Sequence, residues 1–290
     1  MSEHILKVGL VQERWYENQS EHQKKLAAGI FSAANQGARL VCLQELTLSP
    51  YFCTRADVDV KLFMEDIHYG PTAQFVSQCA KDYNVCITAS LFEKAGYNTA
   101  VAYDNTGKLI ATTRKQHIPS GEKYREDHYF TPGDSNYPVH TIVGHSFGLP
   151  TCYDQWFPEL SRIYSLKGTE VLIYPTAIGS EPTAPGFDSQ PMWQKVMLAQ
   201  GIMSNNFIIA VNRIGNEDGL EFYGSSFISN PLGEILVQAS RTESAVLVAE
   251  LDFNQRALWG RLFPFAKQRQ PGTYLALSRE DKFTMEKPNE

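Results

Sequence analysis

The sequence predicts an α/β fold, because short apolar strands and amphipathic helices alternate along its 290 residues. No linker, low-complexity segment or internal repeat interrupts this alternation, so residues 1–290 are expected to form a single domain. A chain of this length can bury one large core. Its composition, with 43% hydrophobic and 20% charged residues, is ordinary for a globular enzyme.

The expected strands are runs rich in Val, Ile, Leu and aromatic residues, bounded by turn residues. They cover residues 6–12, 40–45, 85–91, 100–103, 109–113, 139–143, 171–174, 207–212, 226–229, 235–239 and 245–251. Helical periodicity predicts helices over 21–36, 72–82, 158–166 and 190–205. Asp-Asn-Thr-Gly at 104–107 and Asn-Pro-Leu-Gly at 230–233 are typical of hairpin turns.

The stretch TCYDQWFPE at 151–159 places a thiol between strand-forming residues and a helix start. Pro158 has no donor to lose in a first helical turn, and Asp154 can cap that helix. Backbone N–H groups and the positive end of a helix dipole favour a thiolate. Cys152 is therefore a candidate nucleophile; the alternative is a small hydrophobic side chain of the core.

Two other strand ends carry ionisable side chains, and strand ends are where sites of α/β proteins assemble. Val41, Leu43 and Glu45 share one face of a strand by the period-two rule, so Glu45 arrives at its end among apolar neighbours, suited to proton transfer. Lys115 follows the strand at 109–113. Alternatively, Glu45 caps a neighbouring helix and Lys115 is an ordinary surface lysine.

Glu, Lys and Cys in these settings resemble the nitrilase superfamily of carbon–nitrogen hydrolases. The resemblance covers nearly the whole chain, through LKVGLVQ, LQELTLSPYF, RKQHIP, YREDHYFTPGD, TCYDQWFPE, TAIGSEP, FIIAVNRIG and FYGSSFISNPLGEIL. It implies a four-layer α-β-β-α sandwich. It also implies that Glu45 is the general base, Lys115 the cation facing the oxyanion and Cys152 the nucleophile. Glu126 matches a second glutamate that helps to position the lysine and the substrate.

Two further residues complete the expected catalytic site. The backbone N–H of Tyr153 is a plausible second donor to the oxyanion, and His117 is expected to support the lysine loop. The resulting mechanism is acyl transfer through the Cys152 sulfur, and it needs no cofactor.

Within the superfamily, HIPSGEKYREDHYFTPGD and TAIGSEP resemble the N-carbamoylputrescine amidases. This narrower resemblance implies hydrolysis of a small N-carbamoyl amine, N-carbamoylputrescine, to putrescine, ammonia and carbon dioxide, a step of polyamine synthesis. Tyr124 matches a pocket tyrosine of that group, and Glu181 lies in a segment that resembles its amine-binding loop. Glu181 is otherwise a solvated loop acid. Another carbon–nitrogen hydrolase, such as a β-ureidopropionase or an ω-amidase, remains an alternative.

Two features before Cys152 need explanation: a proline that departs from the family pattern, and a motif that offers another nucleophile. Pro150 is expected to end or bulge the strand before Cys152. GHSFG at 144–148 satisfies the G-x-S-x-G pattern of α/β-hydrolases, with Ser146 as nucleophile. That elbow leads directly into a helix and needs a later histidine, whereas Pro150 follows at once and His145 is the last histidine. A non-catalytic scaffold is the remaining alternative, and it would have no reason to keep Cys152 reactive.

Charge and cysteine usage exclude several classes of protein. A net charge of -6 gives no basic face for nucleic acid. The N-terminus does not read as a signal peptide, and no apolar stretch is long enough for a membrane span, so a soluble cytoplasmic protein is expected. Five scattered cysteines indicate reduced thiols rather than a disulfide framework. No metal-binding or dinucleotide-binding motif is present, so neither a metal nor another cofactor is expected.

The last 36 residues, 255–290, are expected to pack at a subunit interface. They are rich in aromatic residues, and superfamily members commonly form homodimers and larger assemblies. The alternative is that this tail packs on its own subunit. The aromatic residues are Trp259, Phe263, Phe265 and Tyr274.

Overall fold

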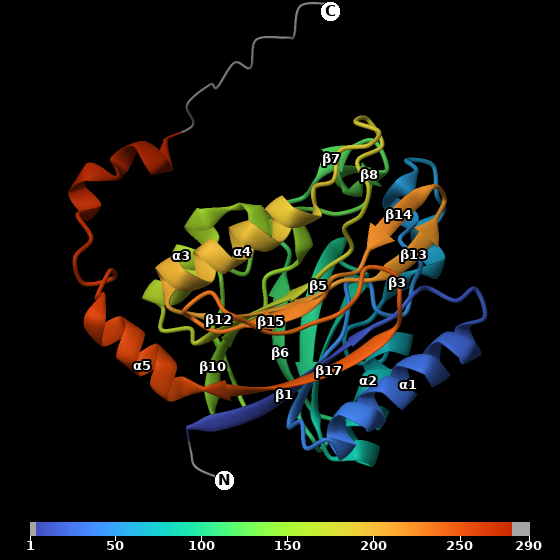
Figure 1. Ribbon diagram of the computed structural model, residues 1–290. Coiled ribbons are helices and arrows are strands. Elements are labelled where there is room, and N and C mark those ends of the chain that lie inside the picture. The colour runs from blue at the N-terminus through green and yellow to red at the C-terminus, as the bar shows by residue number, and fades with distance from the viewer. Residues whose placement is uncertain (1–3, 280–290) are drawn as a thin grey trace, which may run out of the picture.

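Two β-sheets pack face to face at the centre of the computed structural model, which describes residues 4–279 (Figure 1). The first sheet has the order β17 (Ala245–Asp252), β1 (Ile5–Gln12), β2 (Leu40–Cys42), β4 (Cys86–Glu93), β5 (Tyr97–Tyr103) and β6 (Leu109–Arg114), with β3 (Met64–Glu65) paired to β4. The second has the order β16 (Ile235–Gln238), β15 (Phe227–Ser229), β12 (Phe207–Val211), β11 (Val171–Pro175), β10 (His145–Gly148) and β9 (His140–Ile142). Residues 1–3 and 280–290 of the expected domain lie outside the described residues.

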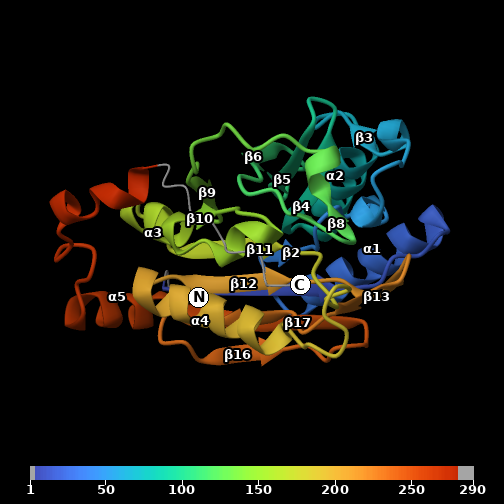
Figure 2. The same cartoon turned by 90° about the horizontal axis from the view of Figure 1, so that it is seen from above.

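A pair of helices covers the outer face of each sheet (Figure 2). Helices α1 (Gln19–Asn35) and α2 (Pro71–Tyr83) pack on the first sheet. Helices α3 (Pro158–Leu166) and α4 (Gln190–Ser204) pack on the second. Close packing of α1 requires a glycine, because a Cβ on Gly29 would meet Cγ1 of Val11 at 2.7 Å. The architecture is the α-β-β-α sandwich that the resemblance implied.

The period-two alternation of the strands explains why two sheets and two helix layers fit together. In β12, Phe207, Ile209 and Val211 lie in the core between the sheets, whereas Ile208 and Ala210 face the helices. A strand buried on both faces reads as a continuous apolar run, as FIIAV does.

Most expected elements are present, and the differences have local causes. The strand predicted at 40–45 ends at Cys42, and the chain then turns at Leu46, which has a left-handed φ of 49°. The strand predicted at 139–143 is the first arm of a hairpin whose second arm is β10. Both expected turns close hairpins, with positive φ at Gly107 and Gly233.

Several short elements were not predicted. They include β3, the hairpins of β7 (Ser120–Gly121) with β8 (Tyr124–Arg125) and of β13 (Ile214–Glu217) with β14 (Leu220–Tyr223), and helix α5 (Phe253–Leu262) in the tail. The second hairpin turns on Asp218-Gly219, both with positive φ. Asp-Gly is a strong hairpin signal, so the sequence does contain the information for this element.

The parallel arrangement of the central strands decides where a site can form. β1, β2 and β4 run parallel in one sheet, and β10, β11 and β12 run parallel in the other. Their carboxyl ends meet at one edge of the sandwich, where loops from both sheets come together. Within residues 4–279, no helix combines the length and apolar character of a membrane span.

Candidate active site

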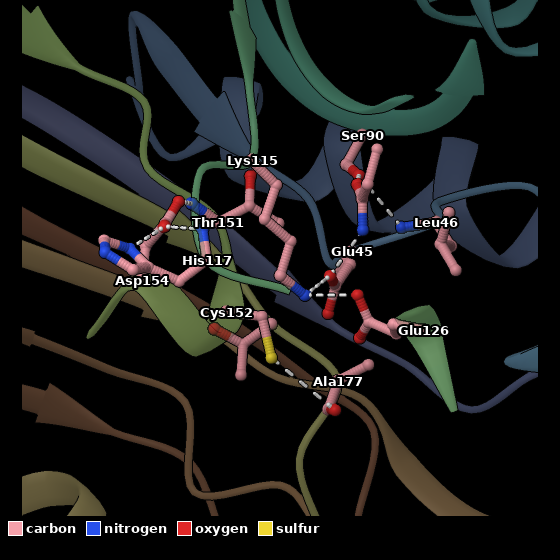
Figure 3. Close-up of polar contacts among 12 residues, drawn as sticks. Glu45, Leu46, Ser90, Lys115, His117, Glu126, Thr151, Cys152, Asp154 and Ala177 are labelled. Atoms are coloured by element: carbon pink, nitrogen blue, oxygen red, sulfur yellow. Dashed lines mark hydrogen bonds and ion pairs between the residues drawn. The ribbon is translucent and has the colours of Figure 1, made fainter. Parts of the chain in front are cut away.

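Loops at the carboxyl ends of three strands bring Glu45, Lys115 and Cys152 to the same edge of the sandwich. Lys115 directly follows β6, and Glu45 lies beyond the end of β2 rather than on the strand as expected. Cys152 begins a 3₁₀ turn, Cys152–Trp156, beyond the end of β10. Figure 3 shows the three side chains pointing toward one another.

Lys115 is the centre of a buried charged cluster. Its Nζ donates to Oε1 of Glu45 at 2.9 Å and to Oε2 of Glu126 at 2.6 Å, and all three side chains are inaccessible to solvent. Burial alone would lower the pKa of Lys115, but the carboxylates of Glu126 and Glu45 raise it well above its ordinary value. Lys115 is therefore a permanent cation, able to stabilise a developing oxyanion.

Glu126 is held from its other side by Tyr51, whose hydroxyl donates to Oε1 at 2.8 Å. Burial raises the pKa of Glu126 to about 7, with Lys115 opposing this shift and Glu45 adding to it. Glu126 therefore contacts the lysine and titrates near neutrality, which fits a positioning role for it.

The Cys152 thiol is buried, and its surroundings favour the protonated form. Its Sγ lies 3.7 Å from the carbonyl oxygen of Ala177, and its backbone φ is 43°. Burial raises its pKa well above the ordinary value, Glu45 and Glu126 add to this, and Lys115 opposes it. The expectation that a helix dipole favours the thiolate is wrong, because α3 begins only at Pro158 and two carboxylates lie nearer. A neutral thiol needs a base to become a nucleophile.

Asp154 joins the cysteine turn to the lysine loop. Its carboxylate accepts hydrogen bonds from the backbone N–H of Thr151 at 3.0 Å and of His117 at 2.9 Å, and contacts Nδ1 of His117 at 2.8 Å. The expectation that Asp154 caps α3 is wrong, since Phe157 is at that cap without a side-chain bond. His117 also stacks on Phe157, with ring centroids 3.6 Å apart. These contacts place His117 where it can support the lysine loop.

The residues before the cysteine exclude the serine motif as a nucleophile elbow. β10 ends at Gly148, before Pro150, as the proline predicts. Ser146 lies inside β10, opposite Thr141 of β9, and its N–H donates to Oε2 of Glu170 at 2.9 Å. Since the serine is within a hairpin strand and not at a turn into a helix, the α/β-hydrolase alternative does not fit.

A cavity of ≈ 250 Å³ opens onto the thiol. Its lining includes Glu126 and two of the residues expected to bind substrate, Tyr153 and Glu181, whereas His117, Glu45 and Lys115 do not line it. The Tyr124 ring also lines it, but the Tyr124 hydroxyl accepts from Gly179 N at 2.9 Å and donates to Ser180 O at 3.1 Å. Tyr124 therefore holds the loop that carries Glu181. The other lining residues are Pro119, Ser120, Gly121, Cys152, Trp156, Ala177 and Ile178.

Sequence reasoning missed the side chains that hold Glu45. Asn98 Nδ2 donates to Oε1 of Glu45 at 2.7 Å, and Ser90 Oγ donates to Oδ1 of Asn98 at 2.9 Å. Ser90 Oγ also accepts the Leu46 N–H at 3.2 Å (Figure 3). Asn98 lies in β5 but before the strand expected at 100–103, so the sequence did not mark it as an asparagine within a strand.

The titration of Glu126 predicts a specific pH dependence of stability. Because its pKa is raised from the ordinary 4.5 to about 7, the folded protein holds this proton more tightly than the unfolded chain does. The stabilisation is complete below pH 4.5 and is lost as the pH rises to about 7. We expect the free energy of unfolding of the wild type to fall relative to that of Glu126→Gln across this window, as measured by urea unfolding. A constant difference between the two proteins would contradict the prediction.

Comparisons with known proteins identify the family of the chain. The family model of the carbon–nitrogen hydrolases matches residues 7–261. A citrullinase of Francisella tularensis is 36% identical over 286 residues, covering 95% of this chain and 99% of that protein. An N-carbamoylputrescine amidase of Arabidopsis thaliana is 38% identical over 263 residues, covering 85% of this chain and 86% of that protein.

A solved structure of a carbon–nitrogen hydrolase has the same fold. A carbon–nitrogen hydrolase of Helicobacter pylori has a TM-score of 0.90 at 32% identity, covering 96% of this chain and 99% of that one. The chain therefore belongs to the carbon–nitrogen hydrolase family, as the resemblance to the nitrilase superfamily implied, and is a hydrolase that acts on amide or ureido carbon–nitrogen bonds.

Proposed function

We propose that this enzyme hydrolyses the ureido carbon–nitrogen bond of N-carbamoylputrescine, releasing putrescine, ammonia and carbon dioxide. The observation that carries the proposal is the charge of the cavity wall. Apart from Glu126 in the catalytic cluster, Glu181 is the charged residue of the lining, and no Lys, Arg or His lines the cavity within the described residues. N-carbamoylputrescine carries an ammonium at the end remote from its ureido group, and a carboxylate is the partner that an ammonium needs.

Other ureido substrates fit this wall less well. Citrulline and N-carbamoyl-β-alanine both carry a carboxylate remote from the ureido group, which calls for a cation in the pocket. A citrullinase and the β-ureidopropionase of Arabidopsis thaliana are relatives at 36% and 30% identity, so both substrates are real alternatives. Citrulline also has an ammonium that Glu181 could bind, so it is a stronger alternative substrate than N-carbamoyl-β-alanine.

The mechanism begins with the neutral thiol. Glu45 accepts the proton of Cys152 as the sulfur attacks the ureido carbonyl carbon. The negative charge that develops on the carbonyl oxygen is stabilised by Lys115 and the backbone N–H of Tyr153. Glu45 then passes the proton to the departing ammonia.

The second half of the reaction frees the cysteine. Glu45 activates a water molecule, which attacks the carbon of the thioester-like intermediate and releases the sulfur as a thiol. The product is a carbamate, which decays to the amine and carbon dioxide. Every proton in this scheme moves through the carboxylate of Glu45.

Substitution of Glu181 tests the substrate. Glu181→Gln should raise the KM for N-carbamoylputrescine about ten- to a hundredfold, since a partly desolvated ion pair contributes roughly 1.5 to 3 kcal/mol. The KM for an uncharged amide should stay nearly unchanged. Steady-state assays of ammonia release give both values.

The matched control is the variant Glu122→Gln. Glu122 is an exposed glutamate in the turn between β7 and β8, and it does not line the cavity. It should leave both KM values as they are. A wild-type preference for citrulline or N-carbamoyl-β-alanine would refute the proposed substrate while leaving the family assignment intact.

We further propose that residues 1–290 form one domain whose tail, from about residue 255, packs against another subunit of a homodimer or larger assembly. Trp259 in α5 donates from Nε1 to Ile202 O at 3.0 Å, which ties the start of the tail to α4 of its own subunit. Beyond α5 the chain lies beside α3 and α4, whose Arg162 and Met203 line one hollow together with tail residues. It exposes Phe263, Leu275 and Leu277 by 47%, 61% and 70%. Apolar exposure of this extent is typical of an interface.

Charges on this part of the tail should dissociate the assembly. We expect the double variant Leu275→Glu and Leu277→Glu to sediment as a smaller species than the wild type, because a buried unpaired carboxylate is costly. Leu62→Glu, at an apolar side chain that is 87% exposed elsewhere on the molecule, is the control and should not change the sedimentation coefficient. A wild type that sediments as a monomer would refute the proposal.

We also propose a cytoplasmic location. All five cysteines lie in the described part of the chain and are free thiols, as is typical of a reducing compartment.

A further inference from the structure

A buried ion pair lies behind the loop that carries Glu45. Arg213 follows β12 and is inaccessible to solvent, and its Nη1 donates to Oε1 of Glu217 in β13 at 2.6 Å. Its Nη2 donates to the carbonyl oxygens of Glu45 at 2.7 Å and of Leu46 at 3.2 Å. One guanidinium therefore holds the two carbonyl groups that flank the Leu46 residue.

The backbone of Leu46 is strained, and these hydrogen bonds from Arg213 can hold it in place. Its φ of 49° lies in the left-handed region, where a branched side chain is strained. A strained residue keeps its conformation only where its surroundings determine it. Because Leu46 directly follows Glu45, relaxation of its backbone would turn the Glu45 side chain away from the sulfur.

The same ion pair reaches the second carboxylate of the cluster. Oε2 of Glu217 accepts the backbone N–H of Tyr51 at 2.7 Å, and the Tyr51 hydroxyl donates to Oε1 of Glu126 at 2.8 Å. Glu217 thus binds Arg213 with one oxygen and Tyr51 with the other. The pair connects the main chain of Glu45 to the side chain of Glu126, and so both anions around Lys115 depend on it.

We propose that Arg213 and Glu217 are positioning residues that set the geometry of Glu45 and Glu126 for proton transfer, an inference that rests on the proposed role of Glu45 as the base. Neither side chain lines the substrate cavity. A buried ion pair is generally no better a stabiliser than apolar side chains of similar volume, so stability alone does not explain it. Displacing a catalytic group by about 1 Å can cost on the order of a hundredfold in rate.

Glu217→Gln is the informative variant. Glutamine keeps the shape but has one acceptor oxygen, so either Arg213 or the Tyr51 N–H loses its partner. We expect kcat to fall about ten- to a hundredfold while KM stays within about twofold, because only the reacting geometry changes. Ammonia release from any ureido or amide compound that the wild type hydrolyses measures both constants.

A second readout does not depend on the substrate. Iodoacetamide alkylates Cys152 only after the thiol has lost its proton, so a displaced base should slow alkylation by a factor similar to the loss in kcat. A purely structural role for Glu217 would not change this rate in the folded protein.

The matched control is Arg256→Gln in α5. Arg256 also donates to backbone carbonyls inside the protein, of Asn205 at 3.0 Å and of Thr169 at 3.1 Å, but far from the catalytic loops. This variant should lower the melting temperature and leave kcat and the alkylation rate unchanged. Should Glu217→Gln fail to fold, Tyr51→Phe, which removes only the hydroxyl bond to Glu126, should lower kcat about tenfold at unchanged KM.

The outcomes separate this inference from the proposed function. A Glu217→Gln or Tyr51→Phe protein that folds and keeps kcat and the alkylation rate within about threefold of wild type would overturn the positioning role. A rise in KM that accounts for the whole loss of kcat/KM would also overturn it. Full activity of Glu45→Gln would instead refute Glu45 as the base.

Discussion

Cys152→Ala should abolish turnover, lowering kcat by on the order of 10⁴-fold or more, while the protein stays folded. Cys152 is the cysteine that lines the substrate cavity, and without its sulfur no covalent intermediate can form. The side chain is small and buried, so alanine leaves the surrounding contacts largely in place. Ammonia release measures the activity, and circular dichroism and thermal unfolding verify the fold.

Cys42→Ala is the control for this substitution. Cys42 is fully buried in the core between the sheets, and burial raises its pKa to about 12, so it should neither contribute to turnover nor react with iodoacetamide in the native protein. Mass spectrometry of the alkylated wild type should find the label on Cys152. A Cys152→Ala enzyme that retained even a few per cent of the wild-type rate would show that another group is the nucleophile.

Glu45→Gln should lower kcat by on the order of 10³-fold with little change in substrate binding. Oε1 of Glu45 binds Lys115 and Asn98, whereas Oε2 is buried without a hydrogen-bond partner among residues 4–279. The unpaired oxygen is the one available to the protonated thiol. An amide keeps the shape of the side chain but cannot accept the proton.

Two measurements isolate the chemical step in Glu45→Gln. Calorimetric titration should still detect substrate binding, and rapid-quench assays should find no fast acylation. Glu65→Gln is the matched control, because Glu65 is a buried carboxylate that binds Thr72 at the start of α2, away from the cavity. A Glu45→Gln enzyme with a near-normal rate would remove Glu45 from the mechanism.

Local sequence patterns were sufficient to predict the main elements, and for the site they supplied candidate residues. Alternation along runs such as FIIAV and VLIYP predicts buried strands, and proline at the first turn places the start of α3. Their places near strand ends, which depend only on neighbours in the chain, make Glu45, Lys115 and Cys152 candidates, and the resemblance to the nitrilase superfamily implies their roles. Relations between residues only a few positions apart can be read directly from the linear sequence.

Tertiary structure alone decided the electrostatics of the site. Whether Cys152 is a thiol or a thiolate depends on its burial and on two carboxylates that are distant in sequence, which is why the dipole argument from TCYDQWFPE was wrong. The same holds for Asp154, which binds the lysine loop instead of capping the following helix. A pKa depends on charges and solvent within a few ångströms, and sequence distance carries little information about those.

The sequence likewise does not predict the contacts that the supporting side chains make with Glu45. Asn98 in β5 and Arg213, which follows β12, contact Glu45 across 53 and 168 residues of sequence. The sequence alone determined which residues are candidates for the chemistry. The tertiary structure decided how they are oriented and charged. Hydrogen-bond geometry and desolvation arise only when loops from both sheets come together at the site.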